Sequence, residues 1–258
     1  MIQRALEAQR AELSHVARLF ADAIADGGVV HVYANGHSRI AVEELCVRMG
    51  ALTGFHPLLQ VGLTSFTDVV GVNGLRGNQA IEKVEGLGAK ILDEYVIGPN
   101  EPLMVVTATG TTPAAVDIAR DWIRRYPRNP LVALCSREQA QRSKPKHSSG
   151  ETMWHVVERA EIGILLDNGM PVGDTSVVVD GKTGKYAICP VSSVSALSFV
   201  QSLNELTLRE LDRRGVRHHV LGNMHLGETQ DNYDAWLSDQ RRRYARALAG
   251  PHFAGDTR

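Results

Sequence analysis

The feature that most constrains this chain is an apolar strand that runs directly into a cluster of hydroxyl side chains. Residues 102–106 have the pattern of a buried strand, residues 107–112 read Thr-Ala-Thr-Gly-Thr-Thr, and a helical pattern starts at Pro113. Such a turn directs several hydroxyls and free backbone N–H groups at one point, which the positive end of the helix dipole also faces. These groups can hold a phosphate without Lys or Arg. The segment therefore predicts a phosphate-binding loop.

A second strand ends in a similar way. Residues 29–33 form an apolar run, and residues 34–38 read Ala-Asn-Gly-His-Ser before another helical pattern. Gly36 allows a tight turn with positive φ, and Ser38 stands where either a helix N-cap or a phosphate-contacting hydroxyl would stand. Two loops that follow two strands of one parallel sheet lie at the same edge, where open α/β sheets bind their ligands.

Length and composition favour one globular domain. The chain has 258 residues, of which 43% are hydrophobic and 22% charged, and its net charge is −1. This balance gives no indication of nucleic-acid binding, and the basic run at residues 241–243 is typical of a solvated helix face. We predict a single domain over residues 1–258, with an N-terminal helix over 1–27, an α/β core over 28–222 and a helical extension over 223–258.

The cysteines and the N-terminus indicate a cytoplasmic protein. The three cysteines, Cys46, Cys135 and Cys189, are far apart and have no zinc-site spacing. An odd number of separated cysteines predicts buried free thiols in a reducing compartment. The first residues form an amphipathic pattern with Glu7 and Glu12, which resembles neither a signal peptide nor a membrane span. We expect no metal and no membrane partner.

Apolar periodicity predicts alternating strands and helices, and hence a parallel sheet covered on both faces. A long polar loop is expected over residues 64–78, where no period is visible. The expected helices cover residues 3–25, 40–52, 79–87, 114–126, 153–160, 193–214 and 231–248; the expected strands cover 29–33, 55–61, 103–107, 131–135 and 162–167, with a hairpin of 177–179 and 186–188 and a short strand near Val220.

The two loops resemble the phosphate loops of the sugar isomerase (SIS) domain, whose second loop typically reads Ser-x-Ser-Gly-x-Thr. Thr107, Thr109, Gly110 and Thr112 occupy those positions, with Thr in place of Ser twice. Residues 147–150, 166–169, 171–174, 189–193 and 227–233 are similar to a group of uncharacterised bacterial SIS-domain proteins. The resemblance implies a flavodoxin-like three-layer α/β/α sandwich and a homodimer or homotetramer. It also implies a phosphosugar ligand and no cofactor.

Several residues are candidates for the site. His37 lies inside the first loop, where it would contact the sugar or transfer a proton. The stretch Glu43-Glu44-Leu45 looks similar to one that supplies a catalytic Glu in phosphoheptose isomerases, so Glu44 is a candidate base; the alternative is an exposed helical glutamate. Ser192 and Ser193 would add donors or only cap the long helix. The expected substrate-binding residues are Asn35, Gly36, Ser38, Thr107, Thr109, Gly110, Thr111, Thr112, Ser192 and Ser193.

Three functions fit these features. The first is an aldose–ketose isomerase, in which a base near C1 and C2 of a phosphosugar or amino-sugar phosphate moves a proton through an enediol. The second is a phosphosugar-binding or sensing protein without chemistry. SIS domains of transcriptional regulators follow a helix-turn-helix domain, for which a first strand by Val29 leaves no room, so DNA binding is disfavoured. The third is lyase or etherase chemistry on a phosphorylated muramic-type sugar.

Overall fold

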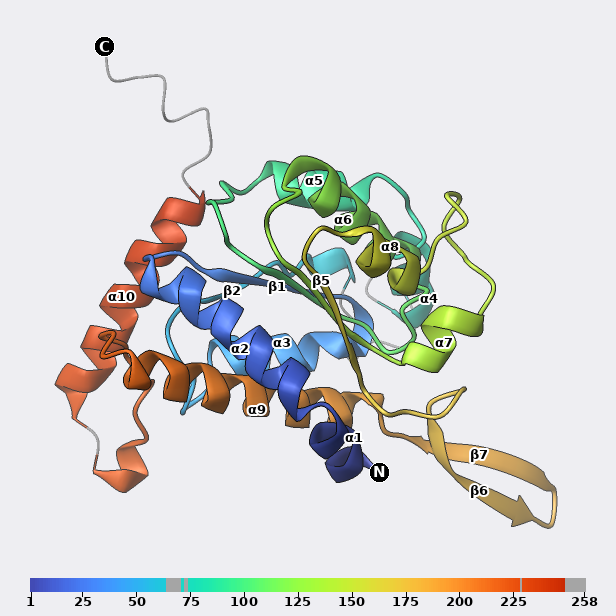
Figure 1. The fold of residues 1–258 in the computed structure, drawn as a ribbon. Coiled ribbons are helices and arrows are strands. Elements are labelled where there is room, and N and C mark those ends of the chain that lie inside the picture. Colours follow the sequence, from blue (N-terminus) through green and yellow to red (C-terminus); the bar gives the residue numbers. More distant parts are fainter. Residues whose placement is uncertain (64–70, 72–73, 228, 249–258) are drawn as a thin grey trace.

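A sheet of five parallel strands forms the centre of the computed structural model, which describes residues 1–63, 71, 74–227 and 229–248 (Figure 1). The strand order is β2-β1-β3-β4-β5. This is the flavodoxin-like order, in which the connections leave β1 in opposite directions toward its two neighbours. The strands are β1 (Val30–Ala34), β2 (Phe55–Pro57), β3 (Leu103–Val106), β4 (Leu131–Cys135) and β5 (Gly163–Asp167).

Helices cover both faces of the sheet. Along each strand the side chains alternate: Val32 and Met104 pack with the helices of one face, and Tyr33 and Val105 with those of the other. The first helical layer contains α2 (Arg10–Ala25), α3 (Arg39–Cys46) and α9 (Ser192–Arg213), and the second contains α5 (Leu87–Asp93), α6 (Pro113–Arg125) and α8 (Met153–Arg159). The predicted three-layer α/β/α sandwich is confirmed. No helix in the described part of the chain is long and apolar enough to span a bilayer.

The two edges of the sheet are covered by polar side chains. At β5, the Gln9 amide accepts from the Asp167 N–H at 2.7 Å and donates to the Asp167 carbonyl at 2.8 Å, as a neighbouring strand would. Gln9 separates α1 (Ile2–Ala8) from α2, so the expected helix over residues 3–25 is two helices. At β2, α10 (Gln230–Leu248) lies alongside, and the Tyr244 hydroxyl donates to the Phe55 carbonyl at 2.6 Å.

Several element boundaries differ from expectation. α3 ends at Cys46 rather than at residue 52, and β2 ends at Pro57 before a 3-10 turn, η2 (Val61–Leu63). The helix expected over 79–87 is replaced by α4 (Leu75–Ile81) and α5, because Gly86 adopts a left-handed conformation (φ 85°) between them. Near Val220 there is only an isolated bridge to Leu52. Most of the loop expected over 64–78 lies outside the described residues, and its last four residues are in α4 rather than in a loop. Two further short helices are α7 (Arg137–Arg142) and η3 (Met224–Leu226).

A two-stranded antiparallel ribbon projects from the body of the molecule (Figure 1). It consists of β6 (Thr175–Gly181) and β7 (Gly184–Pro190), so it is longer than the hairpin expected from sequence. Every residue from 176 to 190 is exposed. The expectation of buried thiols therefore holds for Cys46 and Cys135 but is wrong for Cys189, which lies on this ribbon.

Candidate functional site

The two predicted phosphate loops meet at the point where the strand order reverses. β1 and β3 are adjacent, and their last residues, Ala34 and Val106, pair with each other. The first loop is the 3-10 turn η1 (Gly36–Ser38) with Asn35 before it, and the second covers residues 107–112. Both loops leave the carboxyl ends of neighbouring parallel strands. Their side chains therefore border one crevice, which is the usual ligand position in such sheets.

This crevice contains a cavity of about 420 Å³. The volume lies in the range of small-molecule binding sites. Its walls come from both loops, from α4, from the segment before α8 and from the base of the ribbon. The lining residues are Asn35, Gly36, His37, Ser38, Leu75, Asn78, Gln79, Glu82, Thr107, Ala108, Thr109, Thr112, Lys146, Asp174, Pro190, Ser192 and Ser193.

The second loop is ordered by its own hydroxyls. The Oγ1 atoms of Thr109 and Thr111 are 2.9 Å apart, and the Thr111 N–H donates to Thr109 Oγ1 at 3.3 Å. Thr111 is buried and is not among the described lining residues, so it supports Thr109 from behind. The N–H groups of Thr109, Gly110 and Thr112 donate to no acceptor in the described part of the chain. They are available to an anion at the N-terminus of α6.

Gly110 holds this loop against the core. Its φ of 68° lies in the left-handed region, and its carbonyl accepts from the Met153 N–H at 2.8 Å. A Cβ at this position would lie 2.9 Å from Ala140 Cβ and 3.0 Å from Cys135 Sγ, both of them buried atoms. Because neither the backbone angle nor the space suits another residue, only glycine fits here without strain.

The first loop brings a second group of donors to the cavity. Gly36 has a φ of 58°, and the turn after it places His37 and Ser38 on the cavity wall. His37 is exposed, which leaves its imidazole accessible to a ligand. Asn35 is buried, and its Nδ2 donates to Glu82 Oε2 at 2.8 Å. The loop thus also fixes the orientation of a carboxylate from another element.

Glu82 is a carboxylate on the cavity wall that the sequence analysis did not single out. It follows the last residue of α4 and lines the cavity. Burial raises the pKa of Glu82, while the hydrogen bond from Asn35 and the charge of Lys146 oppose the rise. A partly desolvated carboxylate in a cavity, held by a neutral amide, is suited to accept and return a proton. The hydrophobic period of the sequence did not predict a role for Glu82, because its place at the cavity depends on how α4 packs in the folded protein.

Lys146 is the Lys or Arg among the described residues that line the cavity, and neighbouring residues fix the segment that carries it. The Ser148 N–H donates to Glu85 Oε1 at 2.6 Å, and the Ser148 hydroxyl donates to the same carboxylate. The buried His147 has its Nε2 3.6 Å from Asp117 Oδ1. These contacts anchor the segment to the turn between α4 and α5 and to α6, so that Lys146 lies at the cavity with Glu82.

Ser192 and Ser193 both line the cavity, but they are not equivalent. The Ser192 hydroxyl donates to Asp174 Oδ2 at 2.5 Å, and its N–H donates to Asp174 Oδ1 at 2.7 Å. Asp174 adopts a left-handed conformation (φ 59°) at the base of the ribbon. The Ser192 donors are therefore already occupied, and Ser192 with Asp174 joins the ribbon to α9. Ser193 lies beside them on the wall.

Glu44 is not brought to the cavity. Among the residues described as lining that space, Glu44 is absent. Its carboxylate lies instead between α3 and α9, 3.3 Å from Arg48 Nε and 3.4 Å from Gln201 Nε2. The position on α3 turns the side chain along the helix surface, away from the loop. The geometry therefore favours Glu82 over Glu44 as the carboxylate that faces a ligand.

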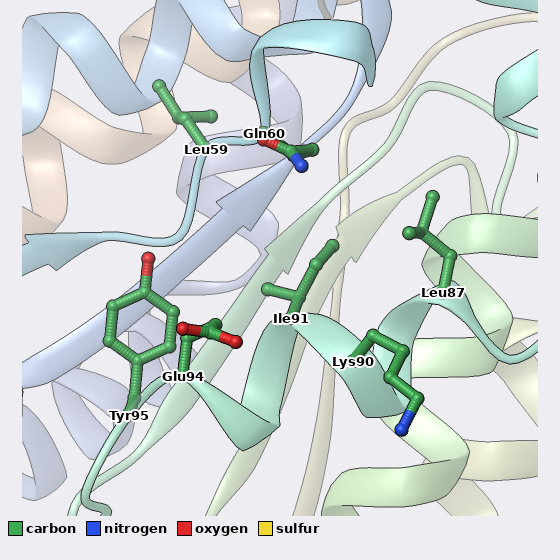
Figure 2. Close-up of a pocket in the computed structure, with 7 residues that line it drawn as sticks. All are labelled: Leu59, Gln60, Leu87, Lys90, Ile91, Glu94 and Tyr95. Atoms are coloured by element: carbon green, nitrogen blue, oxygen red, sulfur yellow. The ribbon is translucent and has the colours of Figure 1, made fainter. Parts of the chain in front are cut away.

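Two further features lie away from the loops. A smaller cavity of about 280 Å³ lies between the segment after β2 and α5, with Tyr95 and Glu94 at one end and Lys90 and Leu87 at the other (Figure 2). No residue of either loop lines it in the described part of the chain. The described residues also contain no group of three or more His, Cys, Asp or Glu side chains arranged to hold a metal ion.

A buried polar cluster occupies the opposite end of the sheet from the cavity. His31 Nδ1 lies 3.1 Å from His56 Nδ1, and His31 Nε2 lies 3.2 Å from Glu101 Oε2. Because the Glu101 carboxylate accepts, His31 donates from Nε2 and accepts at Nδ1 from His56. Burial lowers the pKa of both histidines, that of His56 to about 3. Both rings are therefore neutral at physiological pH, and this cluster is part of the packing between the sheet and α10.

Comparison with known proteins gives a family for the loop-bearing half of the chain. Residues 1–124 match the model of the SIS domain, a stretch that includes β1, β3 and both loops. A UPF0309 protein of Streptomyces avermitilis is 25% identical over 246 residues, which are 95% of this chain and 90% of the relative. The UPF0309 protein TTE0306 of Caldanaerobacter subterraneus is 28% identical over 224 residues, 86% of this chain and 82% of the relative. The similarity to relatives thus extends well beyond residue 124.

Among solved structures, the phosphoheptose isomerase GmhA of Neisseria gonorrhoeae superposes with a TM-score of 0.48 and 10% identity, over 80% of this chain and 90% of that chain. A phosphoheptose isomerase of Francisella tularensis gives a TM-score of 0.44 and 14% identity, over 80% of this chain and 89% of that chain.

Proposed function

We propose that this chain, whose residues 1–124 match the SIS domain, binds a phosphorylated sugar or amino sugar and interconverts its aldose and ketose forms. One observation carries the proposal. A cavity of about 420 Å³ lies at the reversal point of the sheet, between two hydroxyl-bearing loops and a carboxylate. Its volume suits a monosaccharide phosphate. Its walls carry hydrogen-bond donors from both loops and the carboxylate of Glu82.

The phosphate belongs in the second loop. The N–H groups of Thr109, Gly110 and Thr112 and the hydroxyls of Thr107 and Thr109 offer neutral donors at the N-terminus of α6. Donors of this kind bind a dianion by geometry and by the helix dipole. Because the phosphate does not react, its binding energy orients the far end of the sugar.

Glu82 belongs at the reacting end. Its carboxylate removes the proton from C2 of the open-chain aldose, and the electron pair forms the C1–C2 double bond of an enediol while O1 is protonated. The proton then returns from Glu82 to C1, and O2 loses its proton as the ketose carbonyl forms. His37, on the same wall, is our candidate for moving the proton between O2 and O1.

Two measurements test the proposal. In a thermal-shift panel of sugar phosphates and their free sugars, at least one phosphate should raise Tm while its free sugar does not. With that ligand in D2O, deuterium should enter at the exchanging carbon. Binding without exchange would favour the sensing alternative, and loss of a sugar substituent would favour a lyase. Absence of any phosphate-dependent shift would refute the proposal.

A matched pair of variants identifies the base. Glu82→Gln keeps the shape of the side chain, so it should lower kcat by about 100-fold or more while phosphosugar affinity changes only a few-fold. Glu44→Gln, on the surface between α3 and α9, should leave kcat near the wild-type value. If kcat is lost with Glu44→Gln and kept with Glu82→Gln, the assignment of the base is wrong.

A further inference from the structure

The projecting ribbon has one apolar face and one mostly polar face. In the observed register, Val177 pairs with Ile188 and Val179 pairs with Tyr186, so these four side chains share one face. We call this set the apolar ribbon face. Their exposed fractions run from 41% to 47%. The opposite face carries Ser176, Val178, Asp180, Lys185, Ala187 and Cys189, with Asp180 and Lys185 forming an ion pair.

This face is unusual for a ribbon surrounded by water. A two-stranded hairpin by itself is at best marginally stable, and needs packing on an apolar face for a fixed structure. Scattered surface valines need no explanation, but four large apolar side chains in register on one side form a contiguous patch. No described residue of the body covers them, since the whole ribbon is exposed.

We propose that the apolar ribbon face docks on a second copy of this chain, and that the partner's ribbon docks reciprocally on the first. The receiving surface is the exposed side of α3 and α9, which we call the α3–α9 face. It carries Ile40 and Val47 from α3 and its C-cap, and Val194 from the first turn of α9. This inference stands apart from the proposed catalytic function.

The spacing of these residues places them together. Ile40, Glu44 and Val47 are separated by four and three positions, so they lie on one side of α3. Val194 and Gln201 are seven positions apart and share one side of α9. The contact between Glu44 and Gln201 joins the two sides. Ile40, Val47 and Val194 have exposed fractions of 38%, 63% and 52%. Three exposed apolar side chains therefore lie around the Glu44–Gln201 contact on the surface near the base of the ribbon.

The available area favours a second copy over an unrelated partner. A strand of seven residues is about 23 Å long and a two-stranded ribbon about 10 Å wide, so one docking covers about 230 Å² on each side. That is about 460 Å² in total, well below the ~1,000 Å² of a stable interface. Two reciprocal dockings give about 900 Å², close to the area of a stable interface. Only a two-fold arrangement provides both dockings, and such an interface closes on itself.

The proposed contact adjoins the phosphosugar cavity. Asp174 and Pro190, at the two ends of the ribbon, line the cavity, and Asp174 holds Ser192 at the start of α9. A docked ribbon would hold this wall of the cavity in one position. Val194 directly follows the lining residue Ser193, and Ile40 is two positions after the lining residue Ser38, so the partner's ribbon would lie near the mouth.

Sedimentation velocity of the full chain over a wide concentration range tests the proposal. The wild type should form a dimer. Val179→Lys, which places a charge on the apolar ribbon face, should raise the dimer Kd by about 100-fold or more. Val178→Lys is the matched control, because the same residue type one position earlier lies on the opposite face; its Kd should stay within a few-fold. Circular dichroism should show that both variants remain folded.

A mixing experiment tests the reciprocal docking. Val47→Lys should weaken the dimer as Val179→Lys does. A mixture of the two variants retains one unaltered docking, from the intact ribbon to the intact α3–α9 face, so it should associate more tightly than either variant alone. A monomeric wild type, or equal Kd values for Val178→Lys and Val179→Lys, would overturn the proposal. Failure of the mixture to associate better would overturn the α3–α9 face as the receiving surface.

Discussion

Replacing Gly110 with Ala is the sharpest test of how the second loop is built. The left-handed backbone at this position costs a residue with a Cβ about 1–2 kcal/mol. The new Cβ also meets Ala140 Cβ at 2.9 Å and Cys135 Sγ at 3.0 Å in a fully packed region, which adds about 1–3 kcal/mol. The total is about 2–5 kcal/mol. For a chain of this size each kcal/mol lowers Tm by about 2–4 °C.

Gly150→Ala is the control for this prediction. Gly150 also has a left-handed backbone (φ 73°), but a Cβ there would have nothing within 4 Å. It should lose only the backbone contribution of about 1–2 kcal/mol. Equilibrium urea unfolding measures both variants, and their difference isolates the packing contribution. Equal losses of unfolding free energy would refute the reasoning that the loop is fixed by its contact with Ala140 and Cys135.

Three more outcomes are expected. Thr109→Val removes one hydroxyl donor and should weaken sugar-phosphate binding about 10-fold to 100-fold by calorimetry, with no effect on a free sugar; unchanged affinity would exclude Thr109 as a phosphate ligand. His56 is neutral in the folded protein and has its pKa lowered to about 3, so its contribution to stability is present above the unfolded pKa of about 6.5 and is lost as pH falls. Between pH 6.5 and 5 the wild type should therefore lose about 2 kcal/mol more than His56→Gln in urea unfolding, and parallel profiles would contradict this. A thiol reagent should modify Cys189 rapidly in the native protein and Cys46 and Cys135 only after unfolding; fast reaction of all three would contradict their burial.

The sequence was sufficient to predict the sheet and its two loops. Buried parallel strands read as continuous apolar runs, and Gly36 and Gly110 marked the turns because both adopt positive φ. These signals are local, so the residues themselves carry them. The same reasoning predicted Thr107 and Thr109 on the cavity wall, where the structure has them.

Other features depend on contacts between distant segments. The break between α1 and α2 follows from the pairing of Gln9 with Asp167, 158 positions away, and no helical period reports it. Glu82 reaches the cavity because the fold brings the end of α4 next to the first loop, where Asn35 donates a hydrogen bond to the Glu82 carboxylate. Glu44 lay on a plausible motif, but α3 directs its side chain toward α9. Helical spacing predicts which residues share one side of a helix, but it does not predict which part of the protein that side contacts.

The covered edges of the sheet protect the protein against aggregation. An open edge strand offers unpaired N–H and C=O groups to any passing chain, and is a template for aggregation. Here the side-chain amide of Gln9 hydrogen-bonds the backbone of β5 at one edge, and the Tyr244 hydroxyl of α10 donates to a carbonyl of β2 at the other. Truncation before α10 would uncover β2 and would also remove the buried side chains of Trp236 and Arg243. Such a truncated chain should precipitate or form fibrils on storage, which light scattering and thioflavin fluorescence would detect. Gln9→Ala would expose the β5 edge and should promote aggregation in the same way.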